Sequence, residues 1–600
     1  MTVRSVAFTA LLVAIRVAAQ DAIVDVPSGL ATRSLVKDVY GYSIEPVWVN
    51  DYINTPLATN LLSIIANVTG KPPPIRVGGN TADQTYLHST LSTGNDSVAI
   101  PDPGTAKQFN ITPAWYDSWA HYFPPDTDFV YTLNLAVNDS AWSNAVAEAA
   151  AVHAALGDRL KLFELGNEID HFIHKGWRGP DWDVAAYIEQ FRNLTGQIVG
   201  SDWYQSSGAD EKPKFQAGVF ADPPWVPDQQ DEVDDFSIAN LTQGGEGGIV
   251  SRPEDREIIG SYATHLYPQS TCDTARWLRM RLDLLSNHTV LWLNVSQYVP
   301  QVAAADRAGA PLVMGETNSV SCSGKSGISD TFGAALWGVD YVLLGASIGI
   351  QKTYFHLGAQ SEYSSFTPKR YEWKNETLEP GIRAGWYGHY FVAKVVAAEN
   401  GDSGNLGIAA LPAANSSTLS GYAVYSDSGG EEEQKALKKL VFLDMGVWNG
   451  TEGLSNNSTL SATDGTSFSE GERPNGTIRV STPWCAGSNV SVTRLTAPGT
   501  NAKSGVAVSG VAFNTQTGGK IGEEKVEVLS VGQNGTVEFS IRRAEGVLLE
   551  IADTNGSNCI VGVSPSSGGE VPASGAAKSR VALGAGFLVA VIATISMPAL

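Results

Sequence analysis

The sequence predicts an α/β fold: a (β/α)8 TIM barrel followed by an antiparallel β-sandwich domain. Three observations predict it. From residue 36 to residue 398, short apolar or β-branched runs alternate with longer segments of helical periodicity. After residue 399 the chain becomes rich in Gly, Ser, Thr and Asn, with short alternating strands. The 600 residues also exceed what a single core normally holds. Strands that alternate with helices are typical of a parallel sheet, and eight of them close into a barrel.

Eight strand-like runs lie in the first region, at residues 41–44, 74–77, 129–135, 160–165, 214–218, 259–265, 312–315 and 350–355. Helical periodicity appears between them, for example at residues 141–156, 183–196, 275–285 and 332–343. The interval 224–257 is rich in Asp, Glu, Gly and Gln. We expect this interval to be a long solvated loop.

The second region, residues 399–565, contains alternating strand-like runs at 423–425, 440–443, 477–480, 525–531 and 546–551. Short alternating strands separated by turn residues are typical of a sandwich. The stretch 22–26 is also strand-like and precedes the barrel. Residues 20–35 are therefore expected to pair with the β-domain, and the barrel is expected at 36–398.

The two ends of the chain carry targeting signals. Residues 1–19 have a basic residue, an apolar run and small residues before Gln20, which is typical of a secretory signal peptide. The chain also has 17 Asn-x-Ser/Thr sequons, which favours export and glycosylation. Residues 566–600 combine small residues, a polar spacer and an apolar tail at 581–600. This order indicates a glycosylphosphatidylinositol (GPI) anchor, with a plain transmembrane tail as the alternative. The expected location is the cell surface or wall.

Charge and cysteine content limit the possible partners. A formal net charge of -22 without a basic cluster argues against nucleic acid. The cysteines show no metal-binding spacing, so neither a metal nor another cofactor is expected. An even number of cysteines in an exported chain indicates two disulfides. Cys272 and Cys322 fall in loops that follow neighbouring predicted strands, so we pair them, and by elimination Cys485 with Cys559.

The segment Lys161–Asp170, KLFELGNEID, ends an apolar strand in an amide and two carboxylates. Helix capping is the simplest explanation of such residues. However, a later predicted strand ends in Gly315-Glu316-Thr317-Asn318 in the same way. Parallel barrel strands all end on one face, so Glu168 and Glu316 are expected to meet across the mouth of the barrel. Two carboxylates at such a distance are the machinery of glycoside hydrolysis.

These motifs resemble a known family. Asn167-Glu168, Glu316 and His265-Leu266-Tyr267 are similar to the strand ends of the barrel clan of retaining glycosidases. Together with the motif RVGGNTAD at residues 76–83 and the stretch 315–358, they resemble glycoside hydrolase family 79, which contains β-glucuronidases and heparanase. The resemblance implies that Glu168 is the general acid/base and Glu316 the nucleophile.

The expected roles carry physical requirements. The surroundings of Glu168 should raise its pKa, whereas Glu316 should stay ionised and receive hydrogen bonds, for which Tyr267 or His265 is a candidate donor. For His265, a structural role in the barrel is an equally good explanation. Asn167 is placed to bind the sugar 2-hydroxyl. Asn80 is a further substrate-binding candidate.

A uronic acid would need an anion site. The loop 321–327, with Ser323, Gly324 and Lys325, has the composition of an anion-binding nest, although a flexible turn has the same composition. Tyr363 is a weaker candidate. The acidic excess argues against a sulfated polymer as substrate.

The sequence therefore predicts a retaining β-glucuronidase that releases glucuronic or 4-O-methylglucuronic acid from glycans. The alternatives are a same-clan glycosidase for a neutral sugar and an anchored wall protein that binds carbohydrate without hydrolysing it.

Overall fold

The protein is described by a computed structural model. It covers residues 21–27, 30–89, 108–136, 142–222, 236–245, 247–358, 361–373, 376–398, 405–412, 416–427, 436–450 and 468–552. These residues lie within one compact unit, residues 1–558. The predicted signal peptide at 1–19 and the predicted anchor signal at 566–600 lie outside the described residues. In the described part of the chain, no helix has the length and apolarity needed to cross a bilayer.

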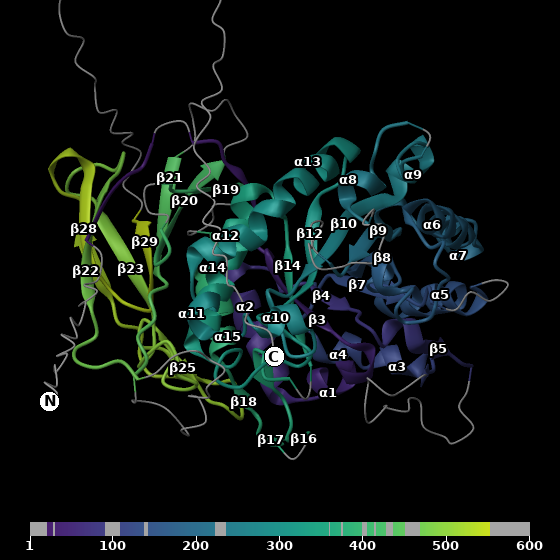
Figure 1. The fold of residues 1–600 in the computed structure, drawn as a ribbon, viewed down its shortest axis with the longest axis horizontal. Coiled ribbons are helices and arrows are strands. Elements are labelled where there is room, and N and C mark those ends of the chain that lie inside the picture. Colours follow the sequence, from purple (N-terminus) through teal and green to yellow (C-terminus); the bar gives the residue numbers. More distant parts are fainter. Residues whose placement is uncertain are drawn as a thin grey trace, which may run out of the picture. The chain divides into compact units, whose positions relative to one another are not determined.

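A closed parallel barrel forms the first part of the fold, as predicted (Figure 1). All eight predicted runs are barrel strands: β3 (Tyr40–Ile44), β4 (Ile75–Val77), β7 (Phe129–Leu133), β8 (Leu160–Leu165), β9 (Lys214–Phe220), β10 (Ile259–Leu266), β12 (Leu312–Thr317) and β14 (Thr353–Leu357). Each strand pairs with the next along the chain, and β14 pairs with β3 to close the barrel. The carboxyl ends of all eight therefore open on one face.

Three predicted helices are present between the barrel strands: α5 (Ser143–Leu156), α6 (Val184–Val199) and α14 (Phe332–Ile348). The prediction of one helix at 275–285 is wrong. That interval contains two short helices, α10 (Thr274–Trp277) and α11 (Leu282–Leu285). The backbone is extended at Arg281, which breaks the helix and places Leu282 and Leu285 in the core.

The interval 224–257 is not only a solvated loop. Residues 223–235 and 246 lie outside the described part, but the remainder contains α8 (Ile238–Leu241) and α9 (Pro253–Ile258). The Ser237 side chain accepts a hydrogen bond at the start of α8, and two residues of α8 are buried. The charge-rich composition concealed this local burial.

The β-domain consists of two facing sheets. One has the order β1 (Ala22–Asp25), β22 (Asn475–Ser481), β28 (Thr536–Arg542). The other contains β2 (Arg33–Leu35), β19 (Asn405–Ala410), β20 (Leu419–Asp427), β21 (Ala436–Asp444), β29 (Glu545–Ile551), β23 (Asn489–Thr496) and β24 (Ala507–Val508), with β27 (Glu527–Ser530) on β23. The N-terminal segment supplies β1 and β2, so residues before the barrel complete both sheets.

Strand β20 contributes side chains to two hydrophobic cores. Ala423 and Tyr425 belong to the core between the two sheets. Tyr422 and Val424 belong to the core that includes the barrel and its helices. Side chains of a strand alternate between its faces, so one strand serves both cores. This packing joins the β-domain to the barrel.

Candidate active site

The two predicted catalytic glutamates meet at the carboxyl ends of the barrel strands. Glu168 follows β8, and Glu316 lies near the end of β12, opposite His265 of β10. One carboxylate oxygen of each glutamate and one ring nitrogen of His265 all lie within 4.8 Å of one another. The barrel thus brings together two glutamates that are 148 residues apart in the sequence.

Glu168 does not act as a helix cap. It precedes a short 3₁₀ helix, Ile169–His171, but its side chain makes no capping hydrogen bond. Its backbone is left-handed, with φ 52° and ψ 59°. That conformation costs a non-glycine residue on the order of 1 kcal/mol, and it is found mainly where function requires a particular side-chain direction. The capping explanation is therefore wrong for this residue.

Three nitrogen-bearing side chains surround the carboxylate of Glu168. His265 Nδ1 lies 3.3 Å from its Oε1, while His171 Nδ1 and Lys175 Nζ lie 3.7 and 3.6 Å from its Oε2. Burial alone would raise the pKa of Glu168, but hydrogen bonds from His171 and His265 and the charge of Lys175 lower it well below its usual range. The expectation that the site raises this pKa is therefore wrong for the unliganded protein. Sequence reasoning missed His171 and Lys175 because they lie beyond the strand end.

His171 is itself held by an acidic neighbour. Its Nε2 lies 2.7 Å from Asp222 Oδ2. Burial alone would lower the pKa of His171, but Asp222 and Glu168 hold it well above its usual range. A protonated His171 next to an ionised Glu168 is consequently the resting arrangement.

Glu316 is held as a carboxylate. Tyr267 donates its hydroxyl to Oε1 at 2.7 Å, and Arg76 donates Nη1 to Oε2 at 2.9 Å. His356 Nδ1 lies 3.5 Å from the same Oε2. Burial alone would raise the pKa of Glu316, but His356, His265 and Arg76 together lower it. An ionised carboxylate with donors on both oxygens is what a nucleophile requires.

Arg76 of strand β4 links several polar side chains of the site, and its own side chain is fully buried. Its Nε donates to Glu164 at 2.8 Å, its Nη1 to Ser43 and Glu316, and its Nη2 to Asn167 Oδ1 at 2.8 Å. Sequence reasoning quoted the motif that contains Arg76 without giving the residue a role. A charged residue inside an apolar strand was the available signal, since such a charge needs buried partners.

Asn167 presents a free donor to the site. Arg76 fixes its Oδ1, and Nδ2 is buried without a hydrogen-bond partner. Its backbone N–H donates to Asp83 at 2.7 Å. A buried donor left unpaired costs about 1 to 3 kcal/mol, so a ligand acceptor is expected there. The geometry is consistent with the role predicted for Asn167.

Glu45, at the end of β3, is a further acidic group that sequence reasoning missed. It accepts the backbone N–H groups of Asn80 and Thr81 at 2.9 and 2.8 Å, and the Thr81 hydroxyl. Burial and the charge of Glu316 raise its pKa to about 7. Asn80 in turn accepts Lys175 Nζ at 2.6 Å. The side chain of Asn80 therefore positions the lysine that faces Glu168.

The loop proposed as an anion nest is only partly available. Cys322, Ser323 and Gly324 all have positive φ. The N–H of Lys325 donates to Ser329, and that of Gly327 donates to Asp330. These two donors are directed into the loop, so they are not available to an anion. The binding roles of Ser323, Gly324 and Lys325 stay predictions.

Tyr363 lies beside the nucleophile. Its ring centroid is 6.3 Å from that of Tyr267 and 6.1 Å from that of His356. A Cβ added to Gly324 would lie 2.8 Å from the Tyr363 backbone nitrogen, so only glycine fits at this contact. The proposed anion loop and Tyr363 are therefore neighbours.

The predicted Cys272–Cys322 disulfide is present, with a Cα–Cα distance of 6.2 Å. Two short parallel strands, β11 (Gln269–Ser270) and β13 (Val320–Ser321), pair beside it. The loops after β10 and β12 are thus joined covalently. Cys559 lies outside the described residues, so its pairing with Cys485 stays a prediction.

The carboxylate pair is better suited to a sugar than to a metal ion. Glu168, His265 and Glu316 are close enough to share an ion. However, Glu316 is already bonded to the charged Arg76, and Lys175 lies beside Glu168. These fixed positive charges oppose a further cation.

Comparison with known proteins agrees with this geometry. Residues 421–548 match the glycosyl hydrolase family 79 C-terminal beta domain. The chain is 28% identical over 525 residues to a beta-glucuronidase of Neurospora crassa, covering 82% of this chain and 87% of the relative. It is also 28% identical over 520 residues to a beta-glucuronidase of Aspergillus niger, covering 82% and 86%.

The fold is also similar to solved structures. A 4-O-alpha-L-rhamnosyl-beta-D-glucuronidase from Fusarium oxysporum matches with a TM-score of 0.67 and 23% identity, over 88% of this chain and 100% of that one. An arabinofuranosidase of family GH51 from Xanthomonas axonopodis matches with a TM-score of 0.53 and 12% identity, over 88% and 99%. At these identities the likeness shows the barrel and β-domain architecture alone. The resemblance to glycoside hydrolase family 79 is confirmed: the chain carries that family's C-terminal β domain behind a (β/α)8 barrel, and it is a glycoside hydrolase.

Proposed function

We propose that the protein is a retaining β-glucuronidase that removes terminal glucuronic acid, or its 4-O-methyl form, from glycans. The observation that carries the proposal is the carboxylate pair, with oxygens of Glu168 and Glu316 within 4.8 Å of each other. Retaining enzymes place their carboxyl groups about 5 to 5.5 Å apart, whereas inverting enzymes need about 6.5 to 9.5 Å to admit a water. The short separation supports direct attack on the sugar.

The first chemical step uses the ionised Glu316. Its carboxylate attacks the anomeric carbon, the bond to the leaving oxygen breaks, and Glu168 donates a proton to that oxygen. Tyr267 and Arg76 hold both oxygens of Glu316 in place for the attack. The Nδ2 of Asn167 is available to the sugar 2-hydroxyl as charge develops.

In the second step, the ionised Glu168 removes a proton from water. The water oxygen bonds to the anomeric carbon, the ester to Glu316 breaks, and the sugar leaves with its β configuration retained. His265, His171 and Lys175 favour the ionised state of Glu168 that this step needs. The first step needs the protonated state, so the enzyme is expected to work best in acidic solution.

The uronic acid preference is supported by the names of the relatives, which are beta-glucuronidases. The site itself offers Tyr363 and the loop 321–327 beside the nucleophile. A site built around a carboxylate leaves polar groups unpaired when it meets a neutral sugar, which costs several powers of ten in kcat/KM.

The test is a panel of nitrophenyl β-glycosides with the purified protein. We expect hydrolysis of the glucuronide and little of the glucoside or galactoside, and the product released first should have the β configuration. The Glu316→Gln variant is the matched inactive control. Equal rates on the glucoside, or a product of α configuration, would contradict the proposal. Glycans ending in 4-O-methyl- or 4-O-rhamnosyl-glucuronate then define the terminal unit, since a solved relative in fold is named for the rhamnosyl form.

We also propose that the protein is exported and that the signal at residues 566–600 directs attachment of a lipid anchor, with loss of the apolar tail. The sequence signals at both ends and the 17 sequons support this location. Treatment of expressing cells with a phosphatidylinositol-specific phospholipase is expected to release the protein. Detection of residues 581–600 in the mature chain would contradict the lipid anchor and favour a transmembrane tail.

A further inference from the structure

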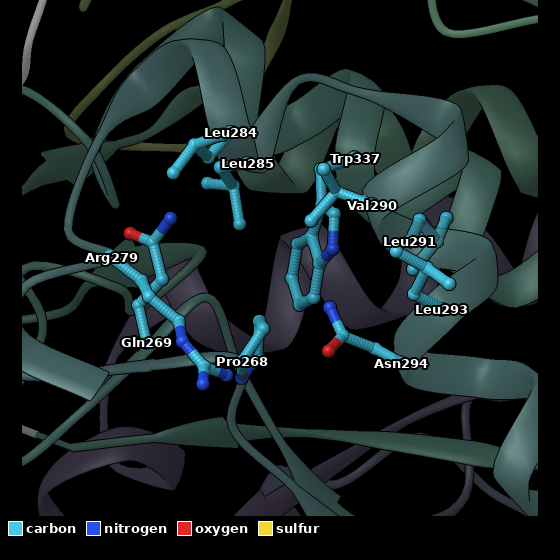
Figure 2. Close-up of a pocket in the computed structure, with 10 residues that line it drawn as sticks. All are labelled: Pro268, Gln269, Arg279, Leu284, Leu285, Val290, Leu291, Leu293, Asn294 and Trp337. Carbon is cyan, nitrogen blue, oxygen red and sulfur yellow. The ribbon is translucent and has the colours of Figure 1, made fainter. Parts of the chain in front are cut away.

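A cavity of about 220 Å³ lies beside the segment that follows Tyr267, and neither catalytic glutamate lines it. It is formed by the chain after Tyr267, by α11 and by α12 (His288–Val295), with Trp337 of α14 on its wall (Figure 2). Its walls are largely apolar, with Leu284, Leu285 and Leu291 among them. Drug-sized pockets are usually about 300 to 1,000 Å³, so this cavity suits a smaller group of the size of one sugar.

One polar atom of the cavity lining has no partner. Gln269 is 3% exposed, and its Nε2 donates to the backbone oxygen of Arg281 at 3.0 Å. Its Oε1 is buried without a hydrogen bond. A buried acceptor in this state costs about 1 to 3 kcal/mol, which a ligand N–H or O–H donor would recover.

The lining also contains a glycosylation sequon. Asn294-Val295-Ser296 has the sequence that oligosaccharide transfer requires. Asn294 is half-buried at the end of α12, and Figure 2 shows its amide turned toward the indole of Trp337 on the cavity lining. The adjacent Trp292 and Leu293 are 42% and 67% exposed. Apolar side chains of this size are therefore left uncovered around the attachment point.

We propose that Asn294 carries an N-linked glycan and that its innermost N-acetylglucosamine occupies this cavity. The donor is a lipid diphosphate that carries the oligosaccharide. A bond forms between Asn294 Nδ2 and the anomeric carbon, the bond from that carbon to the diphosphate breaks, and the amide proton balances the released lipid diphosphate. The proposal depends on export of the chain and is independent of its hydrolytic activity.

The chemistry of the sugar matches the lining. The acetamido N–H of N-acetylglucosamine is a donor for Gln269 Oε1 once this buried amide turns toward the cavity, and the methyl group and ring carbons of the sugar are apolar partners for the leucines and Trp337. A free polyol would satisfy the acceptor but leave the apolar walls in contact with hydroxyls. The covalent link at Asn294 also supplies a high effective concentration, which a weakly binding small cavity needs.

A sugar bound in the cavity would stabilise the segment from Tyr267 to Cys272. Gln269 lies two residues after Tyr267, which donates to Glu316, and three residues before the disulfide at Cys272. A glycan that binds only the folded state increases stability by mass action. Its removal should therefore lower the melting temperature and leave the positions of Glu168 and Glu316 unchanged.

The experiment uses the full chain secreted from a eukaryotic host, with glycopeptide mass spectrometry at each sequon. We expect Asn294 to be occupied. Its glycan should resist peptide N-glycosidase under native conditions at least tenfold longer than the other glycans of the same molecule, and all should be released after denaturation. An unmodified Asn294, or native release at the rate of the other glycans, would overturn the proposal.

Two variants test whether the sugar lies in the cavity. Ser296→Ala removes the sequon and keeps Asn294. Its control is Thr289→Ala, a change at an exposed residue that removes the sequon at Asn287, the N-cap of the same helix, which does not line the cavity. The first should lower the melting temperature by several degrees more than the control. Gln269→Leu fills the place of the unpaired acceptor with a carbon group and should accelerate native release of the Asn294 glycan. Unchanged release in that variant would show that the sugar does not lie in the cavity.

Discussion

Replacement of His171 by Gln should move the alkaline limit of activity to higher pH. The Nδ1 of His171 lies 3.7 Å from Glu168 Oε2. Two unit charges at this distance interact by about 4 kcal/mol at an effective dielectric constant of about 20. Both side chains are partly exposed, so about half of that remains, which corresponds to about 1.5 pKa units. Loss of the positive charge disfavours ionised Glu168, so its pKa must rise.

The assay is the pH dependence of kcat/KM on a nitrophenyl β-glucuronide. The acidic limb reports ionisation of Glu316, and the alkaline limb reports loss of the proton from the pair of Glu168 and His171, whose titrations are linked. In His171→Gln the alkaline limb should rise by about one to two pH units, while the acidic limb moves little. His121→Gln, which changes an exposed histidine, is the control. An unchanged alkaline limb, or one shifted to lower pH, would refute the charge interaction between His171 and Glu168.

Three further predictions concern the same site. Glu168→Gln and Glu316→Gln should each reduce kcat on a natural glycan by about 10²- to 10⁴-fold, with an unchanged circular dichroism spectrum; unfolding of either variant would contradict a role limited to catalysis. Tyr267→Phe removes one hydrogen bond to a charged group, worth about 1.5 to 3 kcal/mol, and should lower kcat by about 10- to 150-fold; an effect on KM alone would argue against its contact with the nucleophile. The double change Cys272→Ser and Cys322→Ser removes the bridge that closes a loop of 50 residues. It should lower the free energy of unfolding by about 4 kcal/mol on the chain-entropy model and raise KM more than it lowers kcat. An effect on kcat alone would contradict a role of loop 321–327 in binding.

The barrel could be predicted because its strands carry local signals. All eight apolar runs became strands, and the equivalent ends of β8 and β12 identified Glu168 and Glu316. Two features were missed because burial rather than composition decided the structure. They are helix α8, in an interval expected to be a loop, and the separation of α11 from α10, where one helix was expected. Sequence periodicity does not show which side of a charge-rich segment faces a core.

The electrostatics of the site could not be predicted in the same way. Glu168 was expected to have a raised pKa from its chemical task, but His171 and Lys175, which lie three and seven residues beyond it, lower the pKa in the free protein. Arg76 reaches Glu316 across 240 residues of sequence. The contact of Arg76 with Glu316 depends on the closed barrel and leaves no spacing pattern in the chain.

The N-terminal strands affect the order of folding. β1 pairs with β22 and β2 with β19, so the first residues after the predicted signal peptide find their partners only when the chain is hundreds of residues longer. Contacts so distant in sequence form slowly, because loop closure must precede them. During synthesis the barrel can therefore form while the sandwich still lacks strands, and the exposed edges at β19 and β22 remain open until the earliest part of the chain returns to them. A protein that lost residues 21–35 would keep its catalytic glutamates but present two unpaired sheet edges, the surface feature most prone to self-association.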